Sequence, residues 1–377
     1  MLPAAAQTGV RARDLSVPFN GTPGALNAIT DVPGVLVGHA TLISGEGKLQ
    51  VGKGPVRTGV TAILPRGHKD LTPVFAATFS QNGNGEMTGT AWIEESGFAE
   101  GPILITNTHS VGIVRDATIK WQIQQQAAGL APKELWSLPI VAETWDGFLN
   151  DINGFHVKDA DAFHALNSAQ GGSVPEGSVG GGTGMVCYGF KGGIGTSSRK
   201  LAQDAGGYTV GVLVQCNCGR RSQLLIAGVP VGQAITANVP YAANMPPVGQ
   251  QDLGSIIIIV ATDAPLLPHQ LKRLTRRATM GLARTGATSG NGSGDLFLAF
   301  STANRFGSTE GVATAKVLGN DSMNPLFEAT AEATEEAIVN AMVASPTMKG
   351  IDDHEVIGLP HDQLRDVLRK YNRLSSK

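Results

Sequence analysis

The chain has 377 residues, of which 42% are hydrophobic and 16% charged, a composition sufficient for a sizeable buried core. Its formal net charge is −2 and it has no basic block, which excludes nucleic acid as a partner. No apolar stretch has the length of a membrane span, so we expect a soluble protein without a membrane partner, cytoplasmic as the sequence stands and periplasmic if a leader has been removed.

Glycine is abundant, with 49 residues, about twice the average usage. Much of the chain is therefore expected in turns and close backbone contacts, and we expect a site built from loops. After an extended arm over residues 1–30, short runs bounded by Gly, Pro or Asn predict strands. The predicted strands are 34–39, 60–64, 74–78, 103–106, 138–141, 185–188, 209–215, 256–262 and 296–300.

Apolar residues at helical spacing predict helices at 113–128, 325–344 and 361–371. A further helix is predicted after the strand 256–262, with Asp263 as its N-cap and Pro265 in its first turn. Sheets with helices on their outer faces form a layered α/β or α+β fold. No repeat occurs, and the linker-like segment 240–253 is too short to separate independent domains.

The three cysteines form no C-x-x-C pair. Cys216 and Cys218 are separated only by Asn217 and are not expected to bond to each other. We interpret both, together with Cys187, as small buried thiols. The histidines are scattered singly without metal-ligand spacing, and the glycine runs match neither a P-loop nor a dinucleotide fingerprint. We therefore expect no metal and no cofactor.

The junction between Gly254 and the strand-opening Ser255 is the most informative local feature. If the bond before Ser255 were cut, the serine would be a nucleophile carrying its own base, the new α-amine, as in N-terminal nucleophile hydrolases. A glycine just before that bond tolerates the distorted backbone that self-cleavage needs. The alternative interpretation is an ordinary loop-to-strand junction with a structural serine.

Several further segments accompany this junction in a fixed order over nearly the whole chain. Their residues are 34–39, 54–61, 82–89, 106–112, 143–147, 189–199, 214–219 and 288–295. Together they resemble the L-aminopeptidase/D-Ala-esterase family, which includes the β-peptidyl aminopeptidases. The resemblance implies an α+β layered fold, a four-layer αββα sandwich of N-terminal-nucleophile-hydrolase-like architecture. It also implies a single catalytic domain over 1–377, self-processed into 1–254 and 255–377, with several processed heterodimers assembled into a homo-oligomer, a tetramer being favoured.

The resemblance assigns roles to four polar residues. Ser255 is the expected nucleophile, and its freed α-amine has a reference pKa of about 7.7–8.0, suitable for a general base. Ser293 and Asp295 are expected to hold and orient that amine, and Asn217 to donate to the oxyanion. The structural alternatives are a turn in which Ser293 and Asp295 bind their own backbone, and a buried asparagine satisfied by the backbone.

Two residues are expected to bind the substrate. Glu143 matches the family glutamate that receives the free amino group, which would explain aminopeptidase selectivity through a charge-assisted contact. Trp145 departs from the tyrosine that several relatives carry there, and an indole N–H can only donate, so its role and the substrate range are open.

The sequence therefore predicts a self-cleaving serine aminopeptidase. Its expected partners are short peptides, amides and esters with a free amine on a β-amino acid or a small α-amino acid, cleaved through an acyl-enzyme on Ser255. One alternative is an acyltransferase of the ornithine acetyltransferase type, which the serine, in place of threonine, disfavours. The other is a non-catalytic binding protein that keeps the same fold unprocessed.

Overall fold

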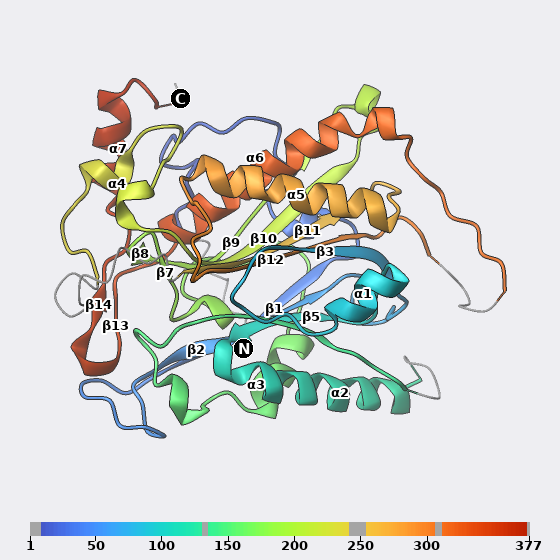
Figure 1. Cartoon of the computed structure of the whole chain (residues 1–377), viewed down its shortest axis with the longest axis horizontal. Coiled ribbons are helices and arrows are strands. Elements are labelled where there is room, and N and C mark those ends of the chain that lie inside the picture. Colours follow the sequence, from blue (N-terminus) through green and yellow to red (C-terminus); the bar gives the residue numbers. More distant parts are fainter. Residues whose placement is uncertain (1–8, 130–134, 241–253, 306–310, 375–377) are drawn as a thin grey trace, which may run out of the picture.

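Two β-sheets stacked between two layers of helices make up the fold (Figure 1). The computed structural model describes residues 9–129, 135–240, 254–305 and 311–374, so the predicted linker-like segment lies almost entirely outside the described residues. Helices α5 (Pro268–Arg284) and α6 (Asn324–Val343) cover one side, and α2 (Val111–Ala127) and α3 (Asp159–Asn167) cover the other. The predicted αββα sandwich is confirmed.

The smaller sheet has four strands in the order β1-β2-β5-β6. These are β1 (Leu36–Ser44), β2 (Val56–Leu64), β5 (Ile103–Asn107) and β6 (Ile140–Thr144). Neighbouring strands are antiparallel except for the parallel pair β5 and β6. The buried Trp121 of α2 belongs to the core cluster between this sheet and its helices.

The larger sheet has six strands in the order β4-β3-β12-β11-β10-β9. These are β4 (Phe98–Ala99), β3 (Val74–Gly83), β12 (Gly294–Ser301), β11 (Ser255–Thr262), β10 (Thr209–Asn217) and β9 (Gly193–Lys200). Only β11 and β12 run parallel to each other. The connection between them passes through α5, as a parallel pair requires.

Strand β11 lies at the centre of the core, which explains its unbroken apolar run. Ile256, Ile258 and Val260 pack toward the helices α5 and α6, whereas Ile257 and Ile259 pack between the two sheets. A strand buried on both faces has no polar face, so apolar and polar residues do not alternate along its sequence.

The shorter elements lie at the edges of the sandwich. They are the helices α1 (Thr90–Ser96), α4 (Val231–Ala234) and α7 (His361–Lys370), and the small pairs β7 (Val186–Cys187) with β8 (Phe190–Lys191) and β13 (Met348–Lys349) with β14 (Glu355–Val356). Within the described part of the chain, no helix is both long enough and apolar enough to cross a membrane.

Several boundaries differ from the prediction. The helix expected after Asp263 begins only at Pro268, because the Asp263 carboxylate accepts the backbone N–H of Thr209 at 2.7 Å and is not its N-cap. The strand predicted at 185–188 retains only two residues in β7. Strand β6 extends to Thr144 and β12 starts at Gly294, so Glu143 and Asp295 lie inside strands.

Candidate active site

Ser255 is the first residue of β11 and lies between two neighbouring strands. It is the register partner of Asn217 on the antiparallel β10. On the β12 side, the backbone N–H of Gly294 donates to Ser255 Oγ at 3.1 Å. The serine is only 6% exposed. Its hydroxyl is therefore held at one end of the six-stranded sheet, within a frame of paired backbone.

Gly254 is pressed against the backbone of β10. A Cβ atom at this position would lie 2.5 Å from the Asn217 carbonyl oxygen and closer still to Cys218 Cα. Such contacts exclude any side chain without movement of the strand. A glycine is thus required before Ser255 by packing, in addition to any chemistry at the bond that joins the two residues.

Ser293 and Asp295 are brought together as the sequence predicts. Both are 1% exposed, and Ser293 Oγ donates to Asp295 Oδ2 at 2.8 Å. Asp295 is in register with Ile256, the residue after Ser255. The residue after β3 fixes the preceding turn, because Asn84 donates from its backbone N–H to the Ser293 carbonyl at 3.2 Å. The carboxylate therefore belongs to the strand that flanks the nucleophile, and the hydroxyl to the residue just before that strand.

The Asn217 side chain is oriented by two backbone groups. Its Oδ1 accepts the N–H of Val186 at 2.8 Å, and its Nδ2 donates to the carbonyl of Trp145 at 3.0 Å. A carboxamide has two N–H donors, and the bond to Trp145 uses one of them. The arrangement fixes the plane of the amide beside Ser255.

Glu143 is buried, 3% exposed, in the other sheet. Its Oε1 accepts the backbone N–H of Glu86 at 2.9 Å, and its Oε2 accepts the hydroxyl of Thr108. Burial raises the pKa of the Glu143 carboxyl above its ordinary value, although these two hydrogen bonds oppose the shift. The carboxylate is thus shielded from bulk water.

Gly85 connects Glu143 with the nucleophile. A Cβ atom on Gly85 would lie 3.2 Å from Glu143 Oε1 and 3.0 Å from the Cα of Gly294, the residue whose N–H binds Ser255. A side chain at this position would displace the Glu143 carboxylate or the backbone of Gly294, so glycine lets these two groups approach each other.

Trp145 contributes to the site through its backbone, and substrate binding by its side chain stays a prediction. Its backbone carbonyl orients Asn217, while its indole is 41% exposed and lies over Gly147, where a Cβ would be 2.6 Å from the ring. The next residue, Asp146, is buried, and burial raises its pKa to about 7. Buried Lys191 lies near enough to act on it electrostatically.

Several contacts of the site were not predicted from the sequence. The backbone N–H groups of Gly294, Glu86 and Val186 and the hydroxyl of Thr108 carry no composition signal of their own. For Glu86, Thr108 and Gly294, only their positions in the segments 82–89, 106–112 and 288–295, which the family resemblance singled out, could have indicated them. Val186 lies in none of the segments that carry the resemblance.

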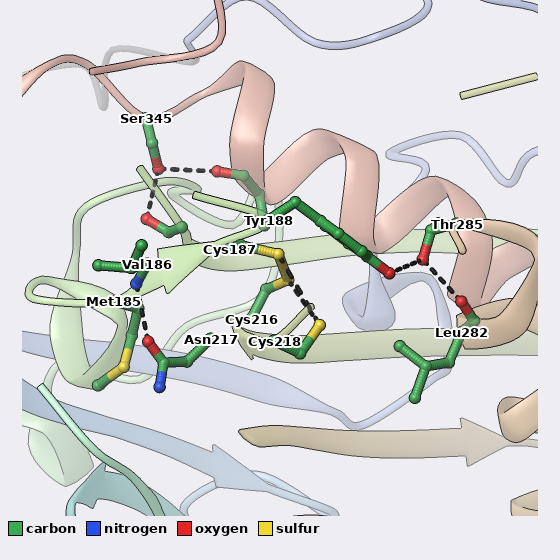
Figure 2. Close-up of a disulfide and its surroundings, with 12 residues drawn as sticks. Met185, Val186, Cys187, Tyr188, Cys216, Asn217, Cys218, Leu282, Thr285 and Ser345 are labelled. Atoms are coloured by element: carbon green, nitrogen blue, oxygen red, sulfur yellow. Dashed lines mark hydrogen bonds between the residues drawn. A yellow bond between two sulfur atoms is a disulfide. The ribbon is translucent and has the colours of Figure 1, made fainter. Parts of the chain in front are cut away.

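The cysteines need a correction (Figure 2). Cys187 of β7 and Cys216 of β10 form a disulfide, so the prediction of thiols is wrong for these two residues. Cys218 remains outside that bond, with its sulfur 3.9 Å from each of the other two. Residues two apart on a strand share a face, which brings Cys216 and Cys218 together. All three are buried, as predicted.

Comparison with known proteins agrees with this geometry. Residues 27–356 match the model of Peptidase family S58. The chain belongs to this family. It is 54% identical over 99% of its length to a β-peptidyl aminopeptidase, BapA, of Sphingosinicella microcystinivorans, of which 95% is covered. A family S58 chain of this kind is a hydrolase, a serine aminopeptidase.

Two solved structures define the fold relationship. The L-aminopeptidase D-Ala-esterase/amidase of Ochrobactrum anthropi, described as a variant of the Ntn hydrolase fold, superposes with a TM-score of 0.90 at 47% identity, covering 97% of this chain and 99% of that one. The β-aminopeptidase of a Burkholderia species superposes with a TM-score of 0.85 at 48% identity, covering 98% and 100%. Neither the acyltransferase nor the non-catalytic alternative is favoured by these matches.

Proposed function

We propose that the chain cleaves itself between Gly254 and Ser255 and then acts as an aminopeptidase through the freed serine. In the first step, Ser255 Oγ attacks the Gly254 carbonyl carbon and the C–N bond breaks, which leaves an ester on the serine and a free α-amine. Water then hydrolyses the ester and separates chains 1–254 and 255–377. The observation that carries this proposal is the buried Ser255 hydroxyl, held by the Gly294 N–H directly beside Asn217.

Substrate hydrolysis follows the same logic. The neutral α-amine of Ser255 takes the hydroxyl proton as Oγ attacks the substrate carbonyl. The Ser293–Asp295 pair holds the resulting ammonium, since a buried carboxylate next to it favours the charged form. The second N–H of the Asn217 amide donates to the oxyanion. The amine then protonates the leaving group, and water attacks the acyl-enzyme.

The charge of the site supports selection for a free amino terminus. Glu143 and Asp295 are both buried carboxylates, and Gly85 lies close to Glu143 Oε1 and to Gly294, the residue before Asp295. In this surrounding a substrate ammonium gains a charge-assisted contact with Glu143, whereas an acylated amine leaves the carboxylate without a counter-charge. The substrates are short peptides, amides and esters with a free amine.

The first residue of the substrate is a β-amino acid or a small α-amino acid. The β-peptidyl aminopeptidase that is 54% identical over 99% of this chain supports the β-amino acid, and the L-aminopeptidase of Ochrobactrum anthropi supports the α-amino acid. Four processed heterodimers assemble into one homo-oligomer, and light scattering on the purified protein would test this number.

Hydrolysis of matched p-nitroanilides tests the substrate class. We expect release of nitroaniline from β-alanyl and L-alanyl p-nitroanilide, and none from the N-acetylated form of either compound. Equal hydrolysis of the free and acetylated compounds would contradict the assignment of Glu143. Hydrolysis of L-alanyl p-nitroanilide alone would remove the β-amino acid from the proposal.

A further inference from the structure

The three cysteines surround the predicted oxyanion donor. Cys216 and Cys218 flank Asn217 in the chain, and Cys187 reaches them from β7 (Figure 2). The three sulfur atoms lie within 4.8 Å of one another, and none of the side chains is more than 3% exposed. Every cysteine of the chain is therefore collected at one point beside the candidate active site.

Three consecutive residues, the two of β7 and Tyr188 after them, are attached to the end of β10 and to Cys218, the residue that follows it. The Val186 N–H binds Asn217 Oδ1 at 2.8 Å, Cys187 is bonded to Cys216, and the Tyr188 N–H donates to the Cys218 carbonyl at 2.6 Å. Strand β7 has two residues, and among the described strands it pairs with the equally short β8 alone. The disulfide is the covalent part of its attachment to β10. The disulfide thus links β7, whose Val186 N–H orients the Asn217 amide, to β10, which carries Asn217.

Cys218 lies beside the disulfide. Its sulfur is 3.9 Å from both bonded sulfurs and therefore not in line with the bond, so its side chain must rotate before its thiolate attacks either one. Attack on Cys187 Sγ forms the Cys187–Cys218 bond and releases Cys216 as a thiolate, which takes up the proton that Cys218 lost. Attack on Cys216 Sγ forms Cys216–Cys218 and releases Cys187 in the same way. Neither reaction consumes an oxidant or a reductant.

We propose that Cys187, Cys216 and Cys218 form a thiol–disulfide exchange site, and that its Cys187–Cys216 bond is a positioning element for Asn217. The second part rests on the proposed function, because it assumes that Asn217 binds the oxyanion. Formation of Cys216–Cys218, or full reduction, removes the covalent tie between β7 and β10. Formation of Cys187–Cys218 moves the tie to the other side of Asn217. In each case the Val186 N–H loses its fixed place against the amide.

Disulfide mapping tests the exchange site without a substrate. Purified wild-type protein is incubated without reductant at neutral and at alkaline pH, quenched in acid, alkylated and analysed by peptide mass spectrometry. We expect Cys187–Cys216 with alkylated Cys218 at neutral pH, and a second isomer with alkylated Cys216 or Cys187 after alkaline incubation, because exchange needs the thiolate. The Cys218→Ser variant should give a single isomer at both pH values. A single isomer in the wild type at both pH values, or no disulfide, would overturn the exchange site.

Kinetics of the processed enzyme test the positioning. Reduction by a phosphine, which becomes the phosphine oxide with oxygen from water while two thiols form, should lower kcat by about tenfold or more with little change in KM. Reoxidation should restore kcat. Cys187→Ser should have the low kcat without any reductant, whereas oxidised Cys218→Ser should keep the wild-type kcat within about twofold.

The outcomes separate this inference from the proposed function. No hydrolysis by oxidised wild type would count against the proposed function and leave the mapping result standing. Hydrolysis with equal kcat in the fully reduced wild type and in Cys187→Ser would overturn the positioning role. If the phosphine does not reach the buried disulfide, the kcat of Cys187→Ser alone tests the positioning role. If Cys187→Ser does not cleave itself, the kcat of the reduced wild type tests that role.

Discussion

Ser255 and Asn217 are register partners at the end of the antiparallel pair β10–β11. The candidate nucleophile and the candidate oxyanion donor are thus placed by the same antiparallel hydrogen-bond ladder. Movement of one of these strands would shift the two residues relative to each other. Trp145 and Val186 fix the amide from its two sides. This preorganisation is the property that an oxyanion site requires, since the donor must be in place before charge develops.

Replacement of Asn217 should therefore affect chemistry and not affinity. We expect Asn217→Ala to lower kcat by about 10²–10³ with KM nearly unchanged, the loss typical for one oxyanion donor. Asn217→Asp is the matched control, because it keeps an acceptor for the Val186 N–H and loses the N–H donors. Steady-state kinetics on processed protein check this. Wild-type turnover in Asn217→Asp would assign Asn217 a structural role only.

Glu143→Gln should depress kcat/KM for free-amine substrates by about ten- to a hundredfold, since a hydrogen bond to a charged group contributes about 1.5–3 kcal/mol. Self-processing should be largely retained, because no substrate amine takes part in it. The fragment pattern on a denaturing gel and the kinetics of the same preparation check both parts. Unchanged kcat/KM would remove Glu143 from substrate binding.

The pH profile gives a second test of Glu143. Substrate binding needs its carboxylate, and burial raises the pKa of this group, so protonation removes activity at a higher pH than an ordinary glutamate would. The Ser255 amine must also lose its proton. Log(kcat/KM) should therefore fall with a limiting slope of about two at low pH in the wild type and about one in Glu143→Gln. Equal slopes would contradict a titrating Glu143.

Asp295→Asn should lower kcat and leave KM nearly unchanged, because in the proposed function the carboxylate positions the Ser255 amine and does not touch the substrate. Loss of its negative charge lowers the pKa of the amine, so the rising limb of kcat against pH should move to lower pH. Ser293→Ala should be similarly defective. Because either change could also block self-cleavage, the two chains are best supplied as separate fragments, with Ser255 exposed by an engineered protease. Full activity with an unshifted rising limb of kcat against pH would leave Ser293 and Asp295 only a structural role in the turn.

Gly85→Ala tests the spacing between the two carboxylate-bearing sheets. The added Cβ would meet Gly294 Cα at 3.0 Å and Glu143 Oε1 at 3.2 Å, so one of them must move. We expect kcat/KM to fall by about tenfold, since small displacements of reacting groups are costly. Gly83→Ala is the matched control, because among the described residues the nearest atom to its Cβ would be Ser80 Oγ, at an ordinary contact distance of 3.4 Å. Equal effects of the two substitutions on kcat/KM would contradict the spacer role.

The sequence predicted the parts of this architecture that depend on local pattern. The isoleucine run after Ser255 marked a strand buried on both faces, and Ser293 and Asp295, two residues apart, indicated side chains that meet. Contacts made by backbone N–H groups across strands, such as Gly294 to Ser255, depend on register and could not be read from residue types. The Cys187–Cys216 pairing likewise joins residues 29 apart in sequence, and only the packing of β7 on β10 brings them together.

The proposed self-cleavage makes Ser255 a new chain terminus, and N-terminal sequencing with intact mass of the purified protein tests this directly. We expect two chains in the wild type, the smaller of which begins Ser255-Ile256-Ile257, and one uncleaved chain of 39.1 kDa without aminopeptidase activity for Ser255→Ala. Ser255→Cys, which retains a nucleophile of similar size, should still be cleaved. A small chain that starts at another residue, or cleavage that persists in Ser255→Ala, would rule out self-cleavage by Ser255.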